Sequence, residues 1–448
     1  MRTWGFTLIL GALCVGLACA GAQADTADDN WPTWRGPTGN GVALKGAPPT
    51  TWSESENIKW KISLPGSGLS TPVVWGNKMF IQTAAPTAEE PPPPQAEEGD
   101  GERQGRRRRG RGMRQPTVPW AFNVVCIDRR NGEVLWEKTA VEAVPHEGHH
   151  PTNSFASYSP VTDGKLLWVS FGTRGLFCYD LDGKKIWSAN LPELATRNGF
   201  GEGSSPGLAG DAIIVLADQQ SGSKVLAFNK NTGAPLWEKE RDEVTSWATP
   251  LAVEVDGKLQ VIIPATKLTR SYDAKTGDLI WQCAGQTVNV IPSPVLGFGR
   301  VYCTSGYRGS SLQAIELGRT GDLTETDAIA WHVDEATPYV ASPLLYDDKI
   351  YVTADLDAVI SCYNAETGAP IFVEQELAGM EGVYASPVGA GGHVYVAGRG
   401  GTTTVLKHGE GFEVVAQNVL DDNFDASPVV IGDELYLKGI ENLYCIAK

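Results

Sequence analysis

Residues 272–281, Tyr-Asp-Ala-Lys-Thr-Gly-Asp-Leu-Ile-Trp, carry a pattern that returns along the whole chain. A strand ends in Asp or Asn, a Thr-Gly or Asn-Gly pair turns the chain, and the next strand closes on an aromatic residue. These dipeptides supply the backbone freedom that a tight hairpin requires. Further copies lie at 127–136, 228–237 and 363–372, and a copy with a shorter turn lies at 179–187.

A second dipeptide, Ser or Thr followed by Pro and an aliphatic residue, opens each period. Proline is tolerated at the first residue of a strand because only a terminal hydrogen-bond donor is lost there. From Pro160 onward, successive copies lie 41 to 49 residues apart, which is the size of a four-stranded propeller blade. The eight prolines are Pro72, Pro160, Pro206, Pro250, Pro294, Pro343, Pro387 and Pro428. The repeats predict an all-β protein with a single eight-bladed β-propeller.

The last period begins at Pro428 and ends before a fourth strand that carries a tryptophan. Ile58–Ile62 precedes the first Thr-Pro and has both the alternation of the missing strand and its Trp60. We therefore expect this N-terminal strand to complete the last blade and close the ring, which removes the free edges of an open sheet.

The aromatic residue that closes the fourth strand is large and flat, and it predicts packing between neighbouring blades. Loss of such a side chain from a core costs about 3–5 kcal/mol. An isolated core aromatic is the alternative, and recurrence in phase disfavours it. The tryptophans in question are Trp60, Trp136, Trp187, Trp237, Trp281 and Trp331.

The copies Asp/Asn-x-x-Thr-Gly-x-x-x-Trp resemble the pyrroloquinoline-quinone-like (PQQ-like) repeats of quinoprotein dehydrogenases and of the non-enzymatic propeller BamB. Residues 31–37, 56–60 and 155–183 are more narrowly similar to exported BamB-like propellers common in planctomycete-type bacteria. The resemblance covers nearly the whole mature chain. It implies the fold, whereas one fold serves many functions.

The resemblance also implies what a quinoprotein site would contain. Such enzymes usually place a vicinal Cys pair against the PQQ, Glu and Asn ligands around Ca²⁺, and an Asp base nearby. No two cysteines are adjacent in this chain, and it has no Cys-x-x-Cys-His haem site. The sequence thus points to no particular cofactor and disfavours PQQ with Ca²⁺.

The chain opens with the features of a secretory signal peptide at residues 1–24. Arg2 supplies the positive charge, Trp4–Ala20 is an apolar run, and Ala22-Gln23-Ala24 is a cleavage site of the Ala-x-Ala type. We therefore expect an exported protein, periplasmic or extracellular. No later stretch has the length and apolar character of a transmembrane helix.

A lipid anchor at Cys19 is an alternative end for the leader. Gly16 stands where a lipobox has a bulky aliphatic residue, which disfavours it. After the leader we expect an N-terminal tryptophan-containing segment at 25–56 and the propeller at 57–448. Its tryptophans either bind carbohydrate or protein or pack along the propeller side, and packing is favoured; they are Trp31, Trp34 and Trp52.

Charge and cysteine usage narrow the function classes. The formal net charge of −16 argues against a general nucleic-acid-binding role. Of eight cysteines, two leave with the leader, and four of the other six share one phase of the repeat. Equivalent positions in different blades lie too far apart for a disulfide. We therefore expect buried thiols at Cys126, Cys178, Cys362 and Cys445.

The stretch 146–153, His-Glu-Gly-His-His-Pro-Thr-Asn, holds three of the six histidines. Imidazoles with a carboxylate can ligate Zn²⁺ or Cu²⁺, although adjacent histidines lack the i, i+4 spacing of a helical metal motif. The alternatives are a metal site, a ligand contact, or a polar loop whose histidines hydrogen-bond across the propeller mouth. The candidate ligand-binding residues are His146, His149, His150 and Asn153.

Residues 84–118 form an insertion within the first blade, with an acidic, proline-rich half followed by an arginine run. The apolar content is too small to offset ordering entropy, so we expect a disordered loop hanging from a hairpin. The arginines either contact a polyanion or are neutralised by the acidic half of the same loop. The polyanion-contact candidates are Arg106, Arg107, Arg108, Arg109 and Arg111.

The favoured function is a non-catalytic binding or scaffold propeller of the cell envelope. Loops at one mouth of the rigid ring would contact a protein or an envelope polymer, and no specific nucleic acid. The alternative is an enzyme, either a PQQ-dependent dehydrogenase or a hydrolase or lyase that uses the 146–153 loop. No nucleophile elbow, phosphate-binding Walker loop or helical zinc motif supports the enzyme.

Overall fold

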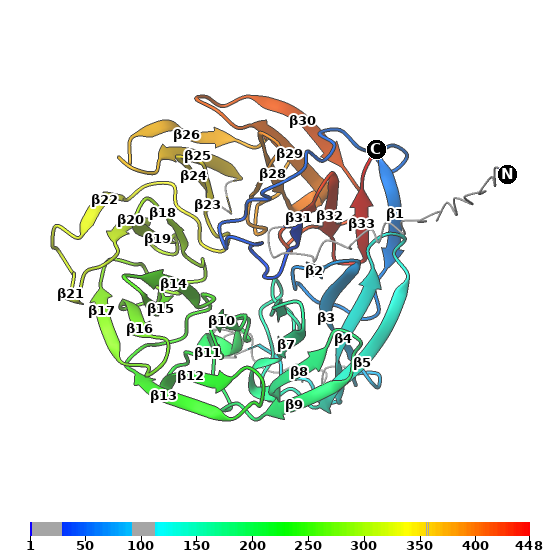
Figure 1. Ribbon diagram of the computed structural model, residues 1–448, viewed down its shortest axis with the longest axis horizontal. Helices are drawn as coiled ribbons and strands as arrows, with labels where there is room; N and C mark the ends of the chain where they lie inside the picture. The colour runs from blue at the N-terminus through cyan, green and yellow to red at the C-terminus, as the bar shows by residue number, and fades with distance from the viewer. Residues whose placement is uncertain (2–28, 92–112, 355, 357) are drawn as a thin grey trace, which may run out of the picture.

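Eight β-sheets stand in a ring around a central channel, as Figure 1 shows. The computed structural model describes residues 1, 29–91, 113–354, 356 and 358–448. Short innermost strands lie at the channel and longer outer strands at the circumference. The predicted all-β, eight-bladed propeller is confirmed.

Each blade has four antiparallel strands that follow one another in sequence from the channel outward, except in blade 8, where β1 is the outermost strand. Blade 1 contains β2 (Val73–Trp75), β3 (Lys78–Pro86), β4 (Trp120–Asp128) and β5 (Val134–Ala143), and blade 2 contains β6 (Val161–Thr162), β7 (Leu166–Ser170), β8 (Leu176–Asp180) and β9 (Lys185–Ala189). Blade 3 contains β10 (Gly207–Ala209), β11 (Ala212–Ala217), β12 (Ser223–Asn229) and β13 (Pro235–Arg241), and blade 4 contains β14 (Leu251–Val255), β15 (Lys258–Ile263), β16 (Thr269–Asp273) and β17 (Leu279–Cys283).

Blade 5 contains β18 (Val295–Gly297), β19 (Arg300–Ser305), β20 (Ser311–Glu316) and β22 (Ile329–Val333), and blade 6 contains β23 (Leu344–Tyr346), β24 (Lys349–Ala354), β25 (Val359–Asn364) and β26 (Pro370–Glu376). Blade 7 contains β27 (Val388–Ala390), β28 (His393–Ala397), β29 (Thr402–Lys407) and β30 (Val414–Val419), and blade 8 contains β31 (Val429–Ile431), β32 (Glu434–Lys438), β33 (Asn442–Ile446) and β1 (Ile58–Ser63). Among the described residues, three short 3₁₀ helices lie in connecting loops: η2 (Gly172–Arg174), η3 (Arg197–Gly199) and η4 (Arg399–Gly401).

The two ends of the chain close the ring together. β1 pairs antiparallel with β33, with Ile62 opposite Leu443 and Trp60 opposite Cys445. In Figure 1 the blue β1 lies beside the red β33. The predicted closure by the N-terminal strand is confirmed.

Blade 4 has a fifth strand that the repeat does not predict. β21 (Gly321–Asp322) comes from the chain between β20 and β22 of blade 5 and pairs in parallel with β17. Its loop lies in the interval from Pro294 to Pro343, which at 49 residues is the longest one after Pro160. Trp281 is fully buried beside it, in a cluster that includes Leu323.

The repeat tryptophans join neighbouring blades through the Gly turns. Gly233 has a φ of 71°, and a β-carbon there would lie 2.5 Å from Cε3 of Trp187. The turn glycine thus permits the backbone conformation and leaves room for the indole of the preceding blade. Indole N–H groups donate to backbone carbonyls of the next blade at 2.9–3.2 Å from Trp60, Trp136, Trp187, Trp237 and Trp331.

The N-terminal segment 31–43 crosses the channel, as the dark blue chain at the centre of Figure 1 shows. Trp31 forms a bridge with β2, Asn40 hydrogen-bonds to β18, and Val42 forms a bridge with β27. Trp31 and Trp34 therefore lie at the channel and not along the side of the propeller. Trp52 does lie on the side, against Tyr395 of blade 7 at 6.5 Å between ring centroids.

The paired strands of blade 1 extend further than the sequence suggested. Pro86 at the end of β3 pairs with Trp120 at the start of β4, so residues 84–86 belong to a strand and not to the insertion.

The six described cysteines are buried in the blades as free thiols. Within the described residues, no helix is long and apolar enough to span a membrane.

Candidate functional site

A ring of hydroxyl groups surrounds the channel where the innermost strands begin. The backbone N–H of each Ser or Thr before proline donates to the hydroxyl oxygen of the equivalent residue in the next blade, at 2.8–3.1 Å in seven of the eight steps. Ser427 donates to Thr71 and closes the circle. The ring residues are Thr71, Ser159, Ser205, Thr249, Ser293, Ser342, Ser386 and Ser427.

Arg35 and Trp34 close the channel just beyond this hydroxyl ring. The Arg35 guanidinium donates to the carbonyls of Pro343 (2.7 Å) and Pro387 (3.0 Å), so it ties two innermost strands together. Burial lowers the pKa of Arg35. Its guanidinium lies 5.5 Å from the centroid of the Trp34 ring, and Trp34 forms part of the floor of the cavity above.

The closed channel leaves a cup at one mouth of the propeller, with a cavity volume of about 460 Å³. The cup has Trp34 at its floor, the hydroxyl ring in its wall and loop residues at its rim. The other lining residues are Leu69, His150, Thr152, Asn153, Ser157, Phe200, Gly203, Trp247, Ile291, Tyr307, Tyr339, Val340, Leu356, Tyr384 and Asp425.

Aromatic side chains from successive blades form one side of the rim. Tyr307 and Tyr339 stack with ring centroids 4.8 Å apart. The guanidinium of Arg399 lies 3.7 Å from the centroid of Tyr384. The same guanidinium donates to both carboxylate oxygens of Asp425, at 2.7 and 2.8 Å, and neutralises that acid.

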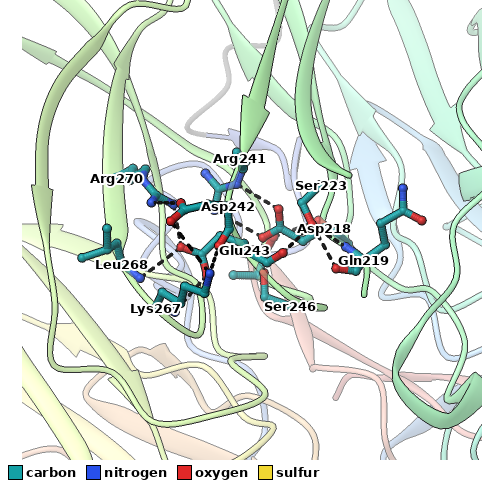
Figure 2. Close-up of polar contacts among 12 residues, drawn as sticks. Asp218, Gln219, Ser223, Arg241, Asp242, Glu243, Ser246, Lys267, Leu268 and Arg270 are labelled. Carbon is teal, nitrogen blue, oxygen red and sulfur yellow. Dashed lines mark hydrogen bonds and ion pairs between the residues drawn. The ribbon is translucent and has the colours of Figure 1, made fainter. Parts of the chain in front are cut away.

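A buried ion pair anchors the loop that carries Trp247 into the rim. Asp218 and Arg241 have fully buried side chains and contact at 2.8 Å, and the Ser246 hydroxyl donates to Asp218. Burial raises the pKa of Asp218, and the positive charge of Arg241 opposes that effect. Figure 2 shows this network, which also includes Asp242, Glu243 and Arg270. The Trp247 indole in turn donates to the carbonyl of Gly201 at 2.8 Å.

Two of the four sequence-predicted ligand residues, His150 and Asn153, line the cup. His150 Nδ1 lies 2.8 Å from the Thr152 hydroxyl, and its ring meets Phe200 edge-on. Burial, reinforced by the charge of Arg399, lowers the pKa of His150. His150 is therefore neutral near pH 7.

The other two histidines hold the loop from beneath. His146 Nε2 donates to the carbonyl of Leu194 at 2.5 Å, and its Nδ1 accepts from Arg174 at 2.8 Å. His149 packs edge-on against Phe155. The sequence grouped these histidines as one site, whereas the structure divides them between the cup and its support.

Glu202 is a buried carboxylate in that support. Its Oε2 accepts from the Tyr158 hydroxyl at 2.8 Å and from the Thr173 N–H at 2.9 Å. Burial raises the pKa of Glu202. Its backbone carbonyl accepts from Asn153 at 3.2 Å, which fixes the amide at the cup.

The arginine candidates of the insertion, Arg106–Arg109 and Arg111, lie outside the described residues. The chain returns from the insertion beside the histidine loop. Met113 donates its N–H to the carbonyl of Asn198 at 3.1 Å, and the Gln115 amide donates to the carbonyl of Pro145 at 3.2 Å.

A family model described as outer membrane protein assembly factor BamB matches residues 121–373, more than half of the chain. The chain belongs to the BamB family. BamB of Burkholderia pseudomallei is 24% identical over 325 residues, which cover 70% of this chain and 76% of that protein. Tetrathionate hydrolase of Acidithiobacillus ferrooxidans is also 24% identical, over 62% of this chain and 54% of its own length.

Solved structures similar to this BamB-family chain share its fold. BamB from Moraxella catarrhalis has a TM-score of 0.57 at 15% identity, and the match covers 87% of this chain and 97% of that one. Quinohemoprotein alcohol dehydrogenase from Comamonas testosteroni has a TM-score of 0.60 at 10% identity, covering 94% and 81%. The fold is therefore common to an assembly factor and to an enzyme.

The residues of this BamB-family cup do not fit PQQ with Ca²⁺. Among the described lining residues Asp425 is the one carboxylate, and Arg399 already holds both of its oxygens. The six described cysteines are buried in the blades and do not line the cup. In the part of the chain that the structure describes, no group of three or more His, Cys, Asp or Glu side chains is placed to hold a metal ion.

Sequence reasoning missed most of the cup. The ring residues are the Ser or Thr of each Ser/Thr-Pro dipeptide, and in the sequence this dipeptide indicates only the start of a strand. Tyr307, Tyr339 and Tyr384 lie in loops of irregular length and occupy no shared repeat position. Only the fold shows that these loops meet at one mouth.

Proposed function

We propose that this chain is a non-catalytic recognition propeller of the cell envelope, which holds a protein or polymer partner at the mouth of the cup. The cup carries the proposal. It combines a blind cavity of about 460 Å³ with half-exposed aromatic rings and a rigid ring of hydroxyls. Ligand pockets typically have such a volume and such a mixture of apolar walls with a few placed polar groups.

Export to the envelope is part of the proposal and rests on the leader features of residues 1–24. The domain limits complete it: a segment at 25–56, the propeller at 57–448 and an insertion that follows β3 in blade 1. Membership of the BamB family supports this reading because its relative in Burkholderia pseudomallei is named an outer membrane protein assembly factor.

Site-specific photo-crosslinking in the producing cell tests the proposal. A photoreactive amino acid at Leu356, which is 70% exposed at the cup, should capture a partner of reproducible mass or composition. The matched control is Leu236 on the outer strand β13, which is 47% exposed and distant from the cup. Equal capture from both positions, or capture from neither, would contradict recognition at the mouth.

A further inference from the structure

We propose that the cup binds the uncharged end of a carbohydrate chain. The inference names the ligand class for the proposed recognition function and rests on it. Four properties of the cup carry it: its charge, its hydrogen-bonding groups, its aromatic surfaces and its closed floor.

The described lining residues offer no free charge to a ligand. Asp425 is the one charged side chain among them, and it is bound to Arg399 through both carboxylate oxygens. His150, with its lowered pKa, adds no charge near pH 7. An ion that leaves water for such a cavity loses hydration without gaining a counter-charge, so an uncharged ligand is favoured.

The wall is rich in groups that both donate and accept hydrogen bonds. A hydroxyl of the ring accepts a backbone N–H, which fixes its position, and retains one O–H to donate. The Ser157 hydroxyl and the Asn153 amide are already paired with each other, and Asn153 also donates to the Phe200 and Glu202 carbonyls. The groups left for a ligand are therefore the hydroxyls of the ring. A purely apolar ligand would leave these groups unsatisfied, whereas sugar hydroxyls match them because each also donates and accepts.

Aromatic rings supply the complementary surface. Tyr307, Tyr339 and Trp247 at the rim and Trp34 at the floor are partly exposed to the cavity. The C–H face of a sugar ring is slightly positive and apolar, and it packs on the negative face of an aromatic ring. A lining that joins such rings to a belt of hydroxyls therefore suits a pyranose better than a hydrocarbon or an ion.

The closed floor determines which part of a chain enters. Segment 31–43 blocks the channel, so the cup has a single opening and a polymer cannot thread through it. A terminal sugar or a short side branch fits a blind cavity of this volume, and the middle of a straight chain does not.

Titration of the full mature protein with neutral oligosaccharides tests the inference. The probes are tetrasaccharides of glucose and of N-acetylglucosamine with different linkages. Calorimetry and the tryptophan fluorescence of the protein, to which Trp34 and Trp247 of the cup contribute, measure binding. An oligogalacturonate is the acidic comparator. We expect at least one neutral sugar to bind and to shift tryptophan emission, with the acidic sugar weaker by about tenfold or more.

Two variants locate the binding. Tyr339→Ala removes one ring of the stacked pair and should weaken binding by about tenfold. Tyr346→Ala removes a tyrosine of blade 6 that stacks on His408, away from the cup, and should leave binding unchanged. Circular dichroism confirms that both variants are folded.

Absence of binding by every neutral sugar at about 10 mM would overturn the ligand class, as would equal effects of the two tyrosine variants. Crosslinks from Leu356 decide whether the proposed function falls with it. A partner captured at Leu356 while sugars fail leaves recognition at the mouth intact and rejects only the carbohydrate.

Discussion

Lys438 is a lysine that the fold buries at the end of β32. Lys438 is only 1% exposed, and its ammonium group donates to the carbonyl of Gly68 in the loop that precedes blade 1. Burial lowers the pKa of Lys438 to about 8, while the charge of Asp422 opposes that effect. The contact joins blade 8 to the neighbouring loop, and it holds a charge in the interior at a cost in stability.

Replacement of Lys438 by methionine should remove one contribution to the pH dependence of stability. A lysine in the unfolded chain titrates near pH 10.4, so between about pH 8 and that value the unfolded chain binds more protons than the folded protein. Lys438 therefore contributes a rise in the free energy of unfolding with pH across this window, by about 3 kcal/mol at most. The buried cysteines, whose pKa burial raises, contribute a fall in the upper part of the same window, so the effect of Lys438 is read as the difference between wild type and variant. Below about pH 8 the penalty is present in full.

Urea unfolding at intervals from pH 7 to pH 10 measures this effect. The stability of Lys438→Met relative to the wild type should fall as the pH rises, whereas Lys165→Met, at an exposed position of blade 2, should keep a constant difference from the wild type. Identical pH profiles for the wild type and Lys438→Met would show that the ammonium reaches water.

At the scale of the element, the glycine of a repeat turn packs against the tryptophan of the preceding blade, as Gly233 does against Trp187. The positive φ of Gly233 satisfies the hairpin of its own blade, and its missing side chain leaves space for Trp187 of the blade before. The sequence showed this Gly and this Trp as two separate repeat features. Their contact depends on how neighbouring blades stack, so periodicity along one chain could not reveal it.

Gly233→Ala should destabilise the protein more than Gly257→Ala. Both glycines have positive φ, 71° and 75°, so both substitutions incur the same backbone strain of about 1 kcal/mol. A β-carbon at 233 meets Trp187 at 2.5 Å, whereas one at 257 meets nothing within 4 Å. The extra cost should be about 1–3 kcal/mol, as for other overpacking changes.

Chemical unfolding of the two single variants, and of each in a Trp187→Ala background, separates strain from contact. In that background Gly233→Ala should cost no more than Gly257→Ala, because the clashing ring is gone. A difference that persists without Trp187 would assign the extra cost to the turn itself.

At the scale of the whole molecule, the ring and its closure followed from the sequence because each depends on local patterns. The alternation of Ile58–Ile62 and the position of Trp60 sufficed to place β1 in the last blade. The channel segment 31–43 and the cup did not follow, because Arg35 meets Pro343 and Pro387 only after the ring has formed. Of the four predicted ligand residues, His150 and Asn153 line the cup because their loop leads into blade 2 at this mouth of the propeller.

Two N-terminal truncations should separate closure of the ring from closure of the channel. A chain that starts at Glu56 loses segment 31–43 and keeps β1; a chain that starts at Leu64 loses both. The second truncation removes the pairing of β1 with β33 and the indole of Trp60, which donates to the carbonyl of Arg129 in blade 1 at 2.9 Å. It also leaves β33 as an open edge, which favours association between chains.

We expect the chain that starts at Glu56 to unfold in one cooperative transition, with a channel open at both ends. The chain that starts at Leu64 should melt at least about 4 °C lower than the first, because loss of a packed tryptophan alone costs about 3–5 kcal/mol. Calorimetry and size-exclusion chromatography measure both effects. Equal melting temperatures and equally monodisperse profiles would mean that blade 8 is stable with three strands. The pairing of β1 with β33 would then contribute nothing to the stability of the ring or to protection from association.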